Sequence, residues 1–296
     1  MLYRALILVT AIGRRIPLSI GRAIGRILGT LAWHVVRRER NKALHNIALA
    51  FPEWDERKRR DTIRAMFRHF GISLFEIAWL WNMDLATRDR TTTFEGIEPM
   101  LKLIDEGRGV ILFTAHVGNW EWLSIAIGLF SRPTSVLQRE RDEAEMGRYI
   151  TEFRARVGVQ SIDRGSPAAP RQMINAVRRG GILAFLLDQN MRTESVKVPF
   201  FGRPALTPIG PVKFAIRTEA WVVTALQERR PDGTHHIRIL EPIQCKRTDD
   251  PRELAARITR EIEEQIRRVP EQWVWMHDRW RERPRWEVTA VPDSSE

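Results

Sequence analysis

The segment Gly109–Trp122 reads GVILFTAHVGNWEW and is the most informative stretch of the 296-residue chain. Its apolar first half predicts a buried β-strand that ends at His116. Gly118 and Asn119 form a turn, and asparagine is a residue type that caps helices. Glu121 then falls in the first turn of the next helix. The chain is therefore expected to pass from strand to helix through a turn that presents His116 and Glu121.

The sequence after about residue 94 repeats this alternation of short apolar runs and helical patterns. Strands that alternate with helices predict an α/β fold, with a largely parallel central sheet flanked by helices. The predicted strands are Gly109–Ala115, Thr134–Leu137, Val159–Ile162, Gly181–Leu187 and Ala220–Leu226. Predicted helices cover much of residues 41–85, together with 120–130, 142–157, 168–179, 208–218 and 252–268.

Polar residues follow several of these predicted strands. In parallel α/β sheets, ligands bind at the edge formed by the carboxyl ends of the strands. If the strands are parallel, these polar residues converge on that edge, and the convergence favours a site. The alternative is that each polar residue simply begins a loop. Besides His116, the residues concerned are Arg139, Asp163, Arg164, Asp188 and Gln189.

His116 and Glu121 have the chemistry of a general base and its orienting partner. A neutral histidine can remove a hydroxyl proton at physiological pH. A nearby carboxylate can fix the imidazole tautomer, and backbone N–H groups at a helix start can stabilise a developing oxyanion. The His-x4-Glu spacing is common by chance, and a histidine at a strand end is often structural. The spacing becomes informative here because His116 ends a predicted strand, and a turn and a helix start follow it.

Other mechanisms lack their motifs in this sequence. There is no P-loop glycine pattern, no Gly-x-Ser-x-Gly elbow and no His-Glu-x-x-His zinc motif. Cys245 is the single cysteine, which excludes an internal disulfide and a cysteine-rich zinc module. ATP-dependent, serine-hydrolase and zinc mechanisms are therefore disfavoured, and we predict no metal and no cofactor.

The formal net charge of +11 is concentrated at one end of the chain. Residues 1–42 carry nine basic residues and one acid, a net charge of +8, which leaves +3 for the other 254 residues. The same segment is the most apolar of the chain. A cationic apolar segment suits an anionic lipid surface better than nucleic acid. We therefore predict an anionic membrane surface as a partner, and no nucleic acid.

The hydrophobic pattern of residues 1–42 is that of an interfacial anchor. Leu6–Ile12 is apolar, but a membrane span needs about 20 apolar residues. From Ile20 onward the pattern becomes helical, with an apolar stripe on one side. An ordinary amphipathic helix packed on the core is the alternative. The stripe comprises Ile20, Ile24, Ile27, Leu28, Leu31 and Val35, and glycines that permit close helix approach recur at Gly21, Gly25 and Gly29.

Three ordered blocks resemble the lipid A biosynthesis acyltransferases, the lauroyl and myristoyl transferases of the wider lysophospholipid acyltransferase superfamily. FTAHVGNWE at 113–121 resembles the His-x4-Asp/Glu block of that family. LLDQN at 186–190, followed by VPFFGRPALTPIGP at 198–211, resembles a second block, and PEQWVWMHDRW at 270–280 resembles its closing signature. The resemblance runs across nearly the whole chain.

The resemblance implies an acyltransferase-like fold and an O-acyltransferase in which His116 and Glu121 form the catalytic dyad. It implies an acyl-carrier-protein or acyl-CoA thioester as donor, and a phosphorylated glucosamine lipid as acceptor. A substrate-positioning arginine is implied at Arg154, with Arg156 as the alternative register. Together with the strand-end residues, this assigns the following to substrate binding: Asn119, Arg139, Arg154, Arg164, Asp188 and Gln189.

The sequence leaves more than one acceptor lipid open. Relatives that acylate a phosphatidylinositol mannoside or an ornithine lipid share the same blocks. A non-catalytic basic protein that binds anionic lipid or nucleic acid would explain the charge, although it leaves the His-Glu site unexplained. The resemblance and the N-terminal pattern together predict the cytoplasmic face of the inner membrane.

We divide the chain into an anchoring helical segment at 1–42, an acyltransferase domain at 43–286 and a disordered tail at 287–296. Glu219 departs from the family, which usually has glycine at that position. The tryptophans near the end of the domain belong either to the core or to a membrane-facing surface. They are Trp273, Trp275 and Trp280.

Overall fold

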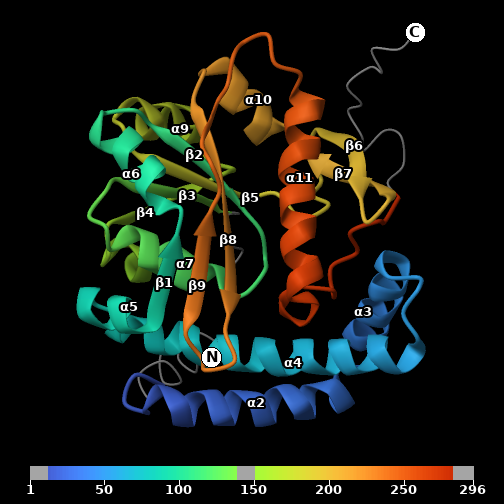
Figure 1. Cartoon of the computed structure of the whole chain (residues 1–296). Helices are drawn as coiled ribbons and strands as arrows, with labels where there is room; N and C mark the ends of the chain where they lie inside the picture. The colour runs from blue at the N-terminus through green and yellow to red at the C-terminus, as the bar shows by residue number, and fades with distance from the viewer. Residues whose placement is uncertain (1–12, 139–150, 283–296) are drawn as a thin grey trace, which may run out of the picture.

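A computed structural model describes residues 13–138 and 151–282 of the chain, shown in Figure 1. Its centre is a mixed sheet in the order β1-β9-β8-β2-β5-β3-β4, with β10 paired to β8. The five neighbouring strands from β8 to β4 are all parallel. Their bounds are β2 Val110–Thr114, β3 Thr134–Gln138, β4 Val159–Asp163, β5 Ile182–Leu186 and β8 Trp221–Arg229.

The prediction of a largely parallel sheet is confirmed, because all five predicted strands are present and parallel. Strand β2 is buried along its whole length, as expected for a strand with helices on both sides. Its neighbours on either side are β5 and β8. The carboxyl end of β2 therefore lies between two parallel neighbours at the centre of the sheet, and the turn with His116 follows it.

Further strands were not predicted. β1 (Thr92–Glu95) and β9 (His235–Ile239) extend the sheet, and β9 runs antiparallel to β8. A separate hairpin is formed by β6 (Ser195–Phe200) and β7 (Arg203–Pro208). These strands are short, and some contain proline, histidine or arginine, so their hydrophobic pattern is weak. β10 (Ile243–Gln244) adds only two residues.

Helices cover both faces of the sheet. α6 (Ile97–Asp105) and α7 (Trp120–Gly128) pack on one face, against residues such as Leu112. The opposite face carries the β6–β7 hairpin and three helices, packed against residues such as Phe113. These three are α9 (Ala169–Arg178), α10 (Gly210–Arg217) and α11 (Pro251–Arg268). Of the predicted helix at 142–157, residues 139–150 lie outside the described part, whereas 151–155 are helical.

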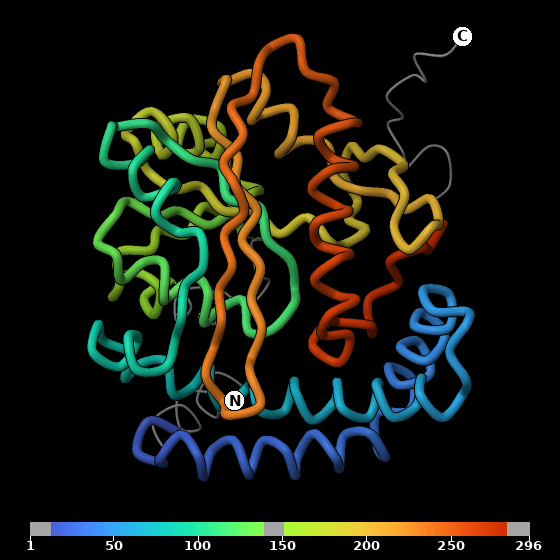
Figure 2. Tube along the Cα trace, viewed as in Figure 1, coloured from blue at the N-terminus to red at the C-terminus, as the bar shows by residue number. Residues whose placement is uncertain are grey.

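A second group of helices lies along one end of the sheet. It consists of α2 (Leu18–Val35), α3 (Arg37–Ala50) and α4 (Glu56–Trp79), followed by the short elements η1 (Leu80–Asn82) and α5 (Leu85–Thr91). Figures 1 and 2 show α2 and α4 side by side across the end of the sheet to which the turn of the β8–β9 hairpin points. Helix α4 is the inner of the two, because its side chains contact the turn after β2.

The α2–α4 contact depends on glycine. A Cβ atom on Gly25 would lie 2.4 Å from the carbonyl oxygen of Gly71, and one on Gly29 would lie 2.3 Å from that of Phe67. The glycine stripe of α2 therefore faces α4 of the same chain. The apolar stripe faces outward and its exposed members are Ile20, Ile27, Leu28, Leu31 and Val35.

The exposed stripe argues against the alternative in which α2 packs its apolar side on the core. Within residues 13–138 and 151–282, no helix combines the length and hydrophobicity that crossing a bilayer requires. Residues 1–12 and the tail at 287–296 lie outside the described residues. The division of the chain at residues 42 and 286 stays a prediction, and residue 42 lies within α3.

Two sequence features of the acyltransferase domain find their explanation in the fold. Glu219 has a φ of 50°, in the left-handed region where glycine is favoured, which explains why a glycine is usual there. Trp273 and Trp275 are fully buried, and Trp280 packs partly buried against Phe200. Of the two readings of these tryptophans, the core reading is therefore correct.

Candidate active site

His116 lies just beyond β2 and is held by Asp188, which lies just beyond β5. Asp188 Oδ1 is 2.8 Å from Nδ1 of His116, and Asp188 Oδ2 accepts a hydrogen bond of 2.9 Å from the backbone N–H of His116. Since β2 and β5 are adjacent and parallel, their ends bring the two residues together. Because a carboxylate at Nδ1 favours the tautomer with its proton there, Nε2 of His116 has a lone pair that can accept a proton.

The surroundings of Asp188 favour its ionised form. Its side chain is fully buried, and Trp273 donates a hydrogen bond of 2.8 Å from Nε1 to Oδ2. Burial alone would raise the pKa of Asp188, but the charge of His116 and the hydrogen bonds from His116 and Trp273 outweigh it and lower the pKa to about 2. The carboxylate is therefore negative at neutral pH and can stabilise a protonated imidazole.

Glu121 has a different partner from the one we expected. We predicted that it orients His116, but Asp188 holds that position. Glu121 instead pairs with Arg154, whose Nε and Nη2 lie 3.1 Å and 2.6 Å from its two carboxylate oxygens. Both side chains are more than four-fifths buried, so this bidentate pair is partly desolvated. Arg154 also donates to Gln138 Oε1 at 2.8 Å, which ties α7 to the end of β3.

The remaining residues assigned to substrate binding have different surroundings. Arg139 lies outside the described residues. Arg164 is exposed just after β4, and Gln189 is half-buried directly after Asp188. Asn119 is buried and caps α7 by accepting from the N–H of Trp122 at 3.2 Å. The structure therefore brings together His116 and Asp188, and separately Glu121 and Arg154.

The turn that carries His116 rests on α4. Nε2 of His69 lies 3.0 Å from the carbonyl oxygen of Gly118, and Nδ2 of Asn119 donates to Glu76 Oε2 at 3.0 Å. Gln227 at the end of β8 accepts from the N–H of Asn119 at 2.6 Å. Gly118 has a φ of 65°, and a Cβ there would lie 2.7 Å from Gln227 Oε1, so the turn requires glycine. The turn is thereby fixed on both sides.

Glu76 is the centre of a buried ion network below this turn. Its side chain is fully buried and pairs with Arg229 at 2.7 Å, with Arg22 of α2 at 2.8 Å and with His235 at 3.3 Å. Although burial opposes it, the charges of His235 and Arg229 hold the pKa of Glu76 well below its usual range. The network therefore connects the surface helix α2 to the turn of His116 through one carboxylate.

Sequence reasoning missed this network and the role of Trp273. His69, Ser73 and Glu76 fall on one face of α4 at spacings of four and three residues, inside an otherwise apolar stretch. A polar stripe on the buried side of a helix is a signal that could have identified them. Their partners on β8 and β9 lie 153 to 160 residues away in the sequence. No local pattern indicates such partners.

Comparisons with known proteins find relatives that match nearly the whole chain. A model of the family described as "Bacterial lipid A biosynthesis acyltransferase" matches residues 2–282. The chain is 28% identical to a lipid A biosynthesis lauroyltransferase of Escherichia coli K12 over 276 residues, covering 91% of this chain and 88% of the relative. It is 26% identical to a palmitoleoyltransferase of the same organism, with the same coverage.

A second group of relatives matches a smaller part of the chain. A phosphatidylinositol mannoside acyltransferase of Mycobacterium tuberculosis is 28% identical over 131 residues, which cover 42% of this chain and 40% of the relative. The names of both groups share acyl transfer and differ in the lipid they specify.

Proposed function

Because the chain belongs to the bacterial lipid A biosynthesis acyltransferase family, we propose that it moves a fatty acyl group from a thioester to a hydroxyl of a glycolipid. The family match and the similarity to named acyltransferases support the reaction type. A lipid A precursor is the proposed acceptor, because the relatives that match over nine-tenths of the chain carry that name. The observation that carries the proposal is the His116–Asp188 pair at the carboxyl edge of the sheet.

In the proposed mechanism His116 acts as the general base. Nε2 takes the proton of the acceptor hydroxyl while the oxygen attacks the thioester carbonyl carbon. The tetrahedral intermediate collapses by breaking the carbon–sulfur bond, and the imidazolium returns its proton to the departing thiolate. Asp188 keeps the imidazole in the required tautomer and stabilises its protonated form by charge. No covalent enzyme intermediate is required.

Glu121 and Arg154 are proposed to act together rather than through His116. Their bidentate pair fixes the first turn of α7, which directly follows the turn of His116. The positive end of that helix favours negative charge beside His116. Arg154 also places a partly exposed guanidinium at the site, where it can position a substrate. Glu121 is therefore proposed to contribute to catalysis by holding Arg154 and the start of α7 in place.

We propose that α2 lies on the cytoplasmic face of the inner membrane. Its outward side combines exposed apolar residues with exposed arginines, as an interfacial helix does. Ile27 is 61% exposed and Val35 is 78% exposed; Arg26 of α2 is exposed as well, and Arg37 and Arg38 are exposed at the start of α3. Since α4 joins α2 to the turn of His116, a lipid in the leaflet would have a short path to the site.

More than one thioester donor and more than one acceptor lipid fit the proposed reaction, and experiment must decide between them. The proposed donors are acyl carrier protein and coenzyme A thioesters, and the alternative acceptors are a phosphatidylinositol mannoside and an ornithine lipid. Partial matches to phosphatidylinositol mannoside acyltransferases favour the first of these alternatives. A non-catalytic basic protein that binds lipid or nucleic acid is less well supported, because it gives no role to the buried His116–Asp188 pair.

The test is acyl transfer by purified protein in detergent micelles. Each thioester is offered with each of the three acceptor lipids, and products are identified by mass spectrometry. The proposal expects an ester product with a lipid A precursor and a matching gain of that acyl chain in cellular lipids when the gene is expressed. Absence of any acylated product with all acceptors, from folded protein, would reject it.

A further inference from the structure

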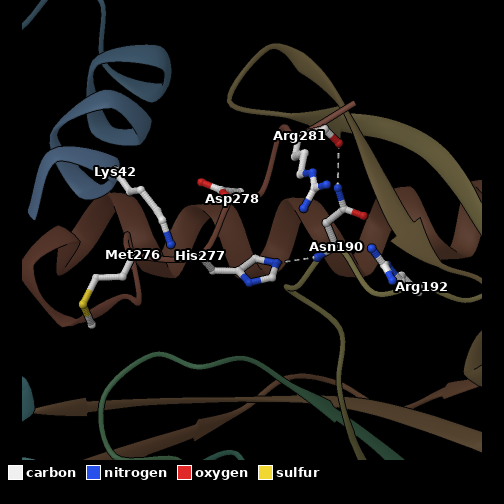
Figure 3. Close-up of a pocket in the computed structure, with 7 residues that line it drawn as sticks. All are labelled: Lys42, Asn190, Arg192, Met276, His277, Asp278 and Arg281. Atoms are coloured by element: carbon white, nitrogen blue, oxygen red, sulfur yellow. Dashed lines mark hydrogen bonds between the residues drawn. The ribbon is translucent and has the colours of Figure 1, made fainter. Parts of the chain in front are cut away.

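A hollow lined by basic side chains lies next to the loop that carries Asp188 (Figure 3). Its volume is about 200 Å³, and its cations come from three separate parts of the chain. Lys42 belongs to α3, Arg192 to the loop after β5, and Arg281 to the segment after α11. The remaining lining residues are Asn190, Met276, His277 and Asp278.

The hollow is close to the proposed base. Asn190 follows Asp188 by two residues, and its backbone N–H donates to Nε2 of His277 at 2.9 Å, the bond drawn in Figure 3. His277 follows Trp273 by four residues, and Trp273 donates to Asp188 Oδ2 at 2.8 Å, so both walls of the hollow continue from residues at the His116–Asp188 pair. A group bound in the hollow would therefore lie near the reacting atoms.

The walls of the hollow are fastened to one another. Asn46 is buried and donates through Nδ2 to the carbonyl oxygens of Trp275 and His277, both at 2.8 Å. This holds α3, and with it Lys42 one turn earlier, against the C-terminal segment. Nδ2 of Asn190 donates to the carbonyl oxygen of Arg281 at 2.8 Å and joins the loop after β5 to the same segment. The cations are therefore brought together by fixed backbone rather than by chance side-chain positions.

The charges in the hollow favour an anion. Lys42, Arg192 and Arg281 line the hollow beside a single lining carboxylate, Asp278. Lys42 pairs with Glu39 at 2.9 Å, and since ion pairs at partly exposed positions are weak, Lys42 can change partner. His277 adds no charge in this state, because its Nε2 accepts a hydrogen bond.

One further atom is available for a ligand. Within the described residues, Oδ1 of Asn190 is buried and has no hydrogen-bond partner. It can accept a hydrogen bond from a hydroxyl, such as that of a protonated phosphate or a sugar. Two arginines supply planar forks of donors that match phosphate oxygens, and a lysine supplies a further charge. The chemistry of the lining is therefore that of a phosphate site with an adjacent acceptor.

We propose that this hollow, lined by Lys42, Arg192 and Arg281, binds a phosphate group of one of the two substrates during acyl transfer. The inference rests on the proposed function and deepens it. Two sources supply the same chemistry: a phosphate on the glycolipid acceptor, or the phosphopantetheine phosphate of the thioester donor. Either would be held near His116 by the same three cations.

The test uses alanine variants of the full-length enzyme. Lys42→Ala, Arg192→Ala and Arg281→Ala each remove one cation and retain the backbone hydrogen bonds. Arg260→Ala, on the exposed side of α11, is the matched control. The KM is measured for acceptor and donor separately, using acceptor with and without its phosphate. Loss of one charge-assisted contact is worth about 1.5–3 kcal/mol, which predicts a rise in KM of about 10- to 150-fold.

The pattern of KM changes identifies the phosphate. If the acceptor supplies it, only the KM for the phosphorylated acceptor rises, and the dephosphorylated acceptor is unaffected by the substitutions. If the donor supplies it, the KM for the thioester rises with both acceptors. Both patterns support the inference, with a kcat close to that of Arg260→Ala. Unchanged KM values for both substrates in all three variants would overturn it.

A binding measurement separates this inference from the proposed function. Inorganic phosphate is titrated into wild-type protein and the Arg192→Ala/Arg281→Ala double variant and followed by phosphorus NMR. The inference predicts saturable binding to the wild type that is weakened at least about 10-fold in the double variant. If the wild type transfers no acyl group, the proposed function fails and the phosphate titration still decides the site. Equal phosphate binding by both proteins would contradict the site even in an active enzyme.

Discussion

Nδ1 of His116 lies 2.8 Å from Oδ1 of Asp188, although the two residues are 72 positions apart in the sequence. The contact exists because β2 and β5 are adjacent and parallel and end in register. Asp188 is fully buried and also accepts from the backbone of His116 and from Trp273. The histidine is therefore held by a carboxylate that is itself fixed by two further donors.

Replacing Asp188 with asparagine tests the orientation of the base. Asp188→Asn keeps the shape of the side chain but removes the charge that favours a protonated His116. We expect kcat/KM for acyl transfer to fall about 100- to 10,000-fold, the range typical for loss of general-base catalysis. Glu241→Gln, the same change at an exposed loop carboxylate, is the control. Activity of Asp188→Asn equal to that of the control would show that Asp188 does not serve the base.

The Glu121–Arg154 pair is tested by a double-mutant cycle. Glu121→Gln and Arg154→Gln each leave a partly buried charge without its partner, so each should lower kcat/KM at least about 10-fold. Since the two residues act as one unit, the double variant should be little worse than the poorer single variant. Effects on kcat/KM that simply multiply would mean that the two side chains act independently.

The buried histidine His69 makes stability depend on pH. Burial, followed by the charge of Arg229, lowers the pKa of His69 from 6.5 to about 3. Between these values the unfolded chain binds a proton that the folded protein does not, so folding stability is full above about pH 6.5 and falls as the pH drops. The slope from this residue approaches about 1.4 kcal/mol per pH unit.

Urea denaturation between pH 7 and about pH 4.5 measures this slope. His69→Gln, which keeps a polar side chain without the titration, should have a lower stability at pH 7 but a flatter pH dependence. The slope is read above about pH 4.5, because the lowered pKa values of Glu76 and Asp188 add their own loss of stability only below the usual values of 4.5 and 3.8. Parallel stability curves for wild type and His69→Gln would exclude His69 as the source.

The outward side of α2 is predicted to bind anionic membranes. Ile27→Glu and Leu31→Glu alter the exposed stripe and leave the glycine contact with α4 intact. Reversal of Arg26, Arg37 and Arg38 to glutamate should also weaken binding, by about 1 kcal/mol for each basic residue lost near the surface. Arg22 is not suitable for this test because it pairs with the buried Glu76.

Vesicle sedimentation measures this binding. Both sets of variants should pellet less than wild type with vesicles that contain phosphatidylglycerol, and the charge-reversal set should differ more at low salt. Hydrolysis or transfer with a soluble thioester should be retained. If both sets sediment as fully as the wild type, the membrane contact lies elsewhere in the chain.

The parallel sheet could be predicted because its strands are short apolar runs separated by helical patterns. The antiparallel hairpin of β6 and β7 could not, because Pro199, Pro204 and Pro208 make its strands read as loops. β9 was missed for a related reason, since His235, His236 and Arg238 interrupt its apolar residues. Such strands are stabilised by neighbours that are distant in the sequence.

Part of the candidate site could also be predicted from the sequence, and part could not. His116 stands out because a strand, a turn and a helix start surround it in one continuous segment. Its pairing with Asp188 depends on the order of strands in the sheet, which the sequence does not specify. The position of Glu76 depends on the packing of α4 under that sheet, and the close contact of Gly25 with Gly71 sets where α2 lies.

The central claim is that His116 is the general base of an acyl transfer, and the most direct test is the kcat/KM of His116→Ala. The account predicts a fall of about 100- to 10,000-fold, with thermal unfolding and vesicle binding close to those of the wild type. A folded His116→Ala protein that transfers acyl groups at the wild-type rate would contradict it.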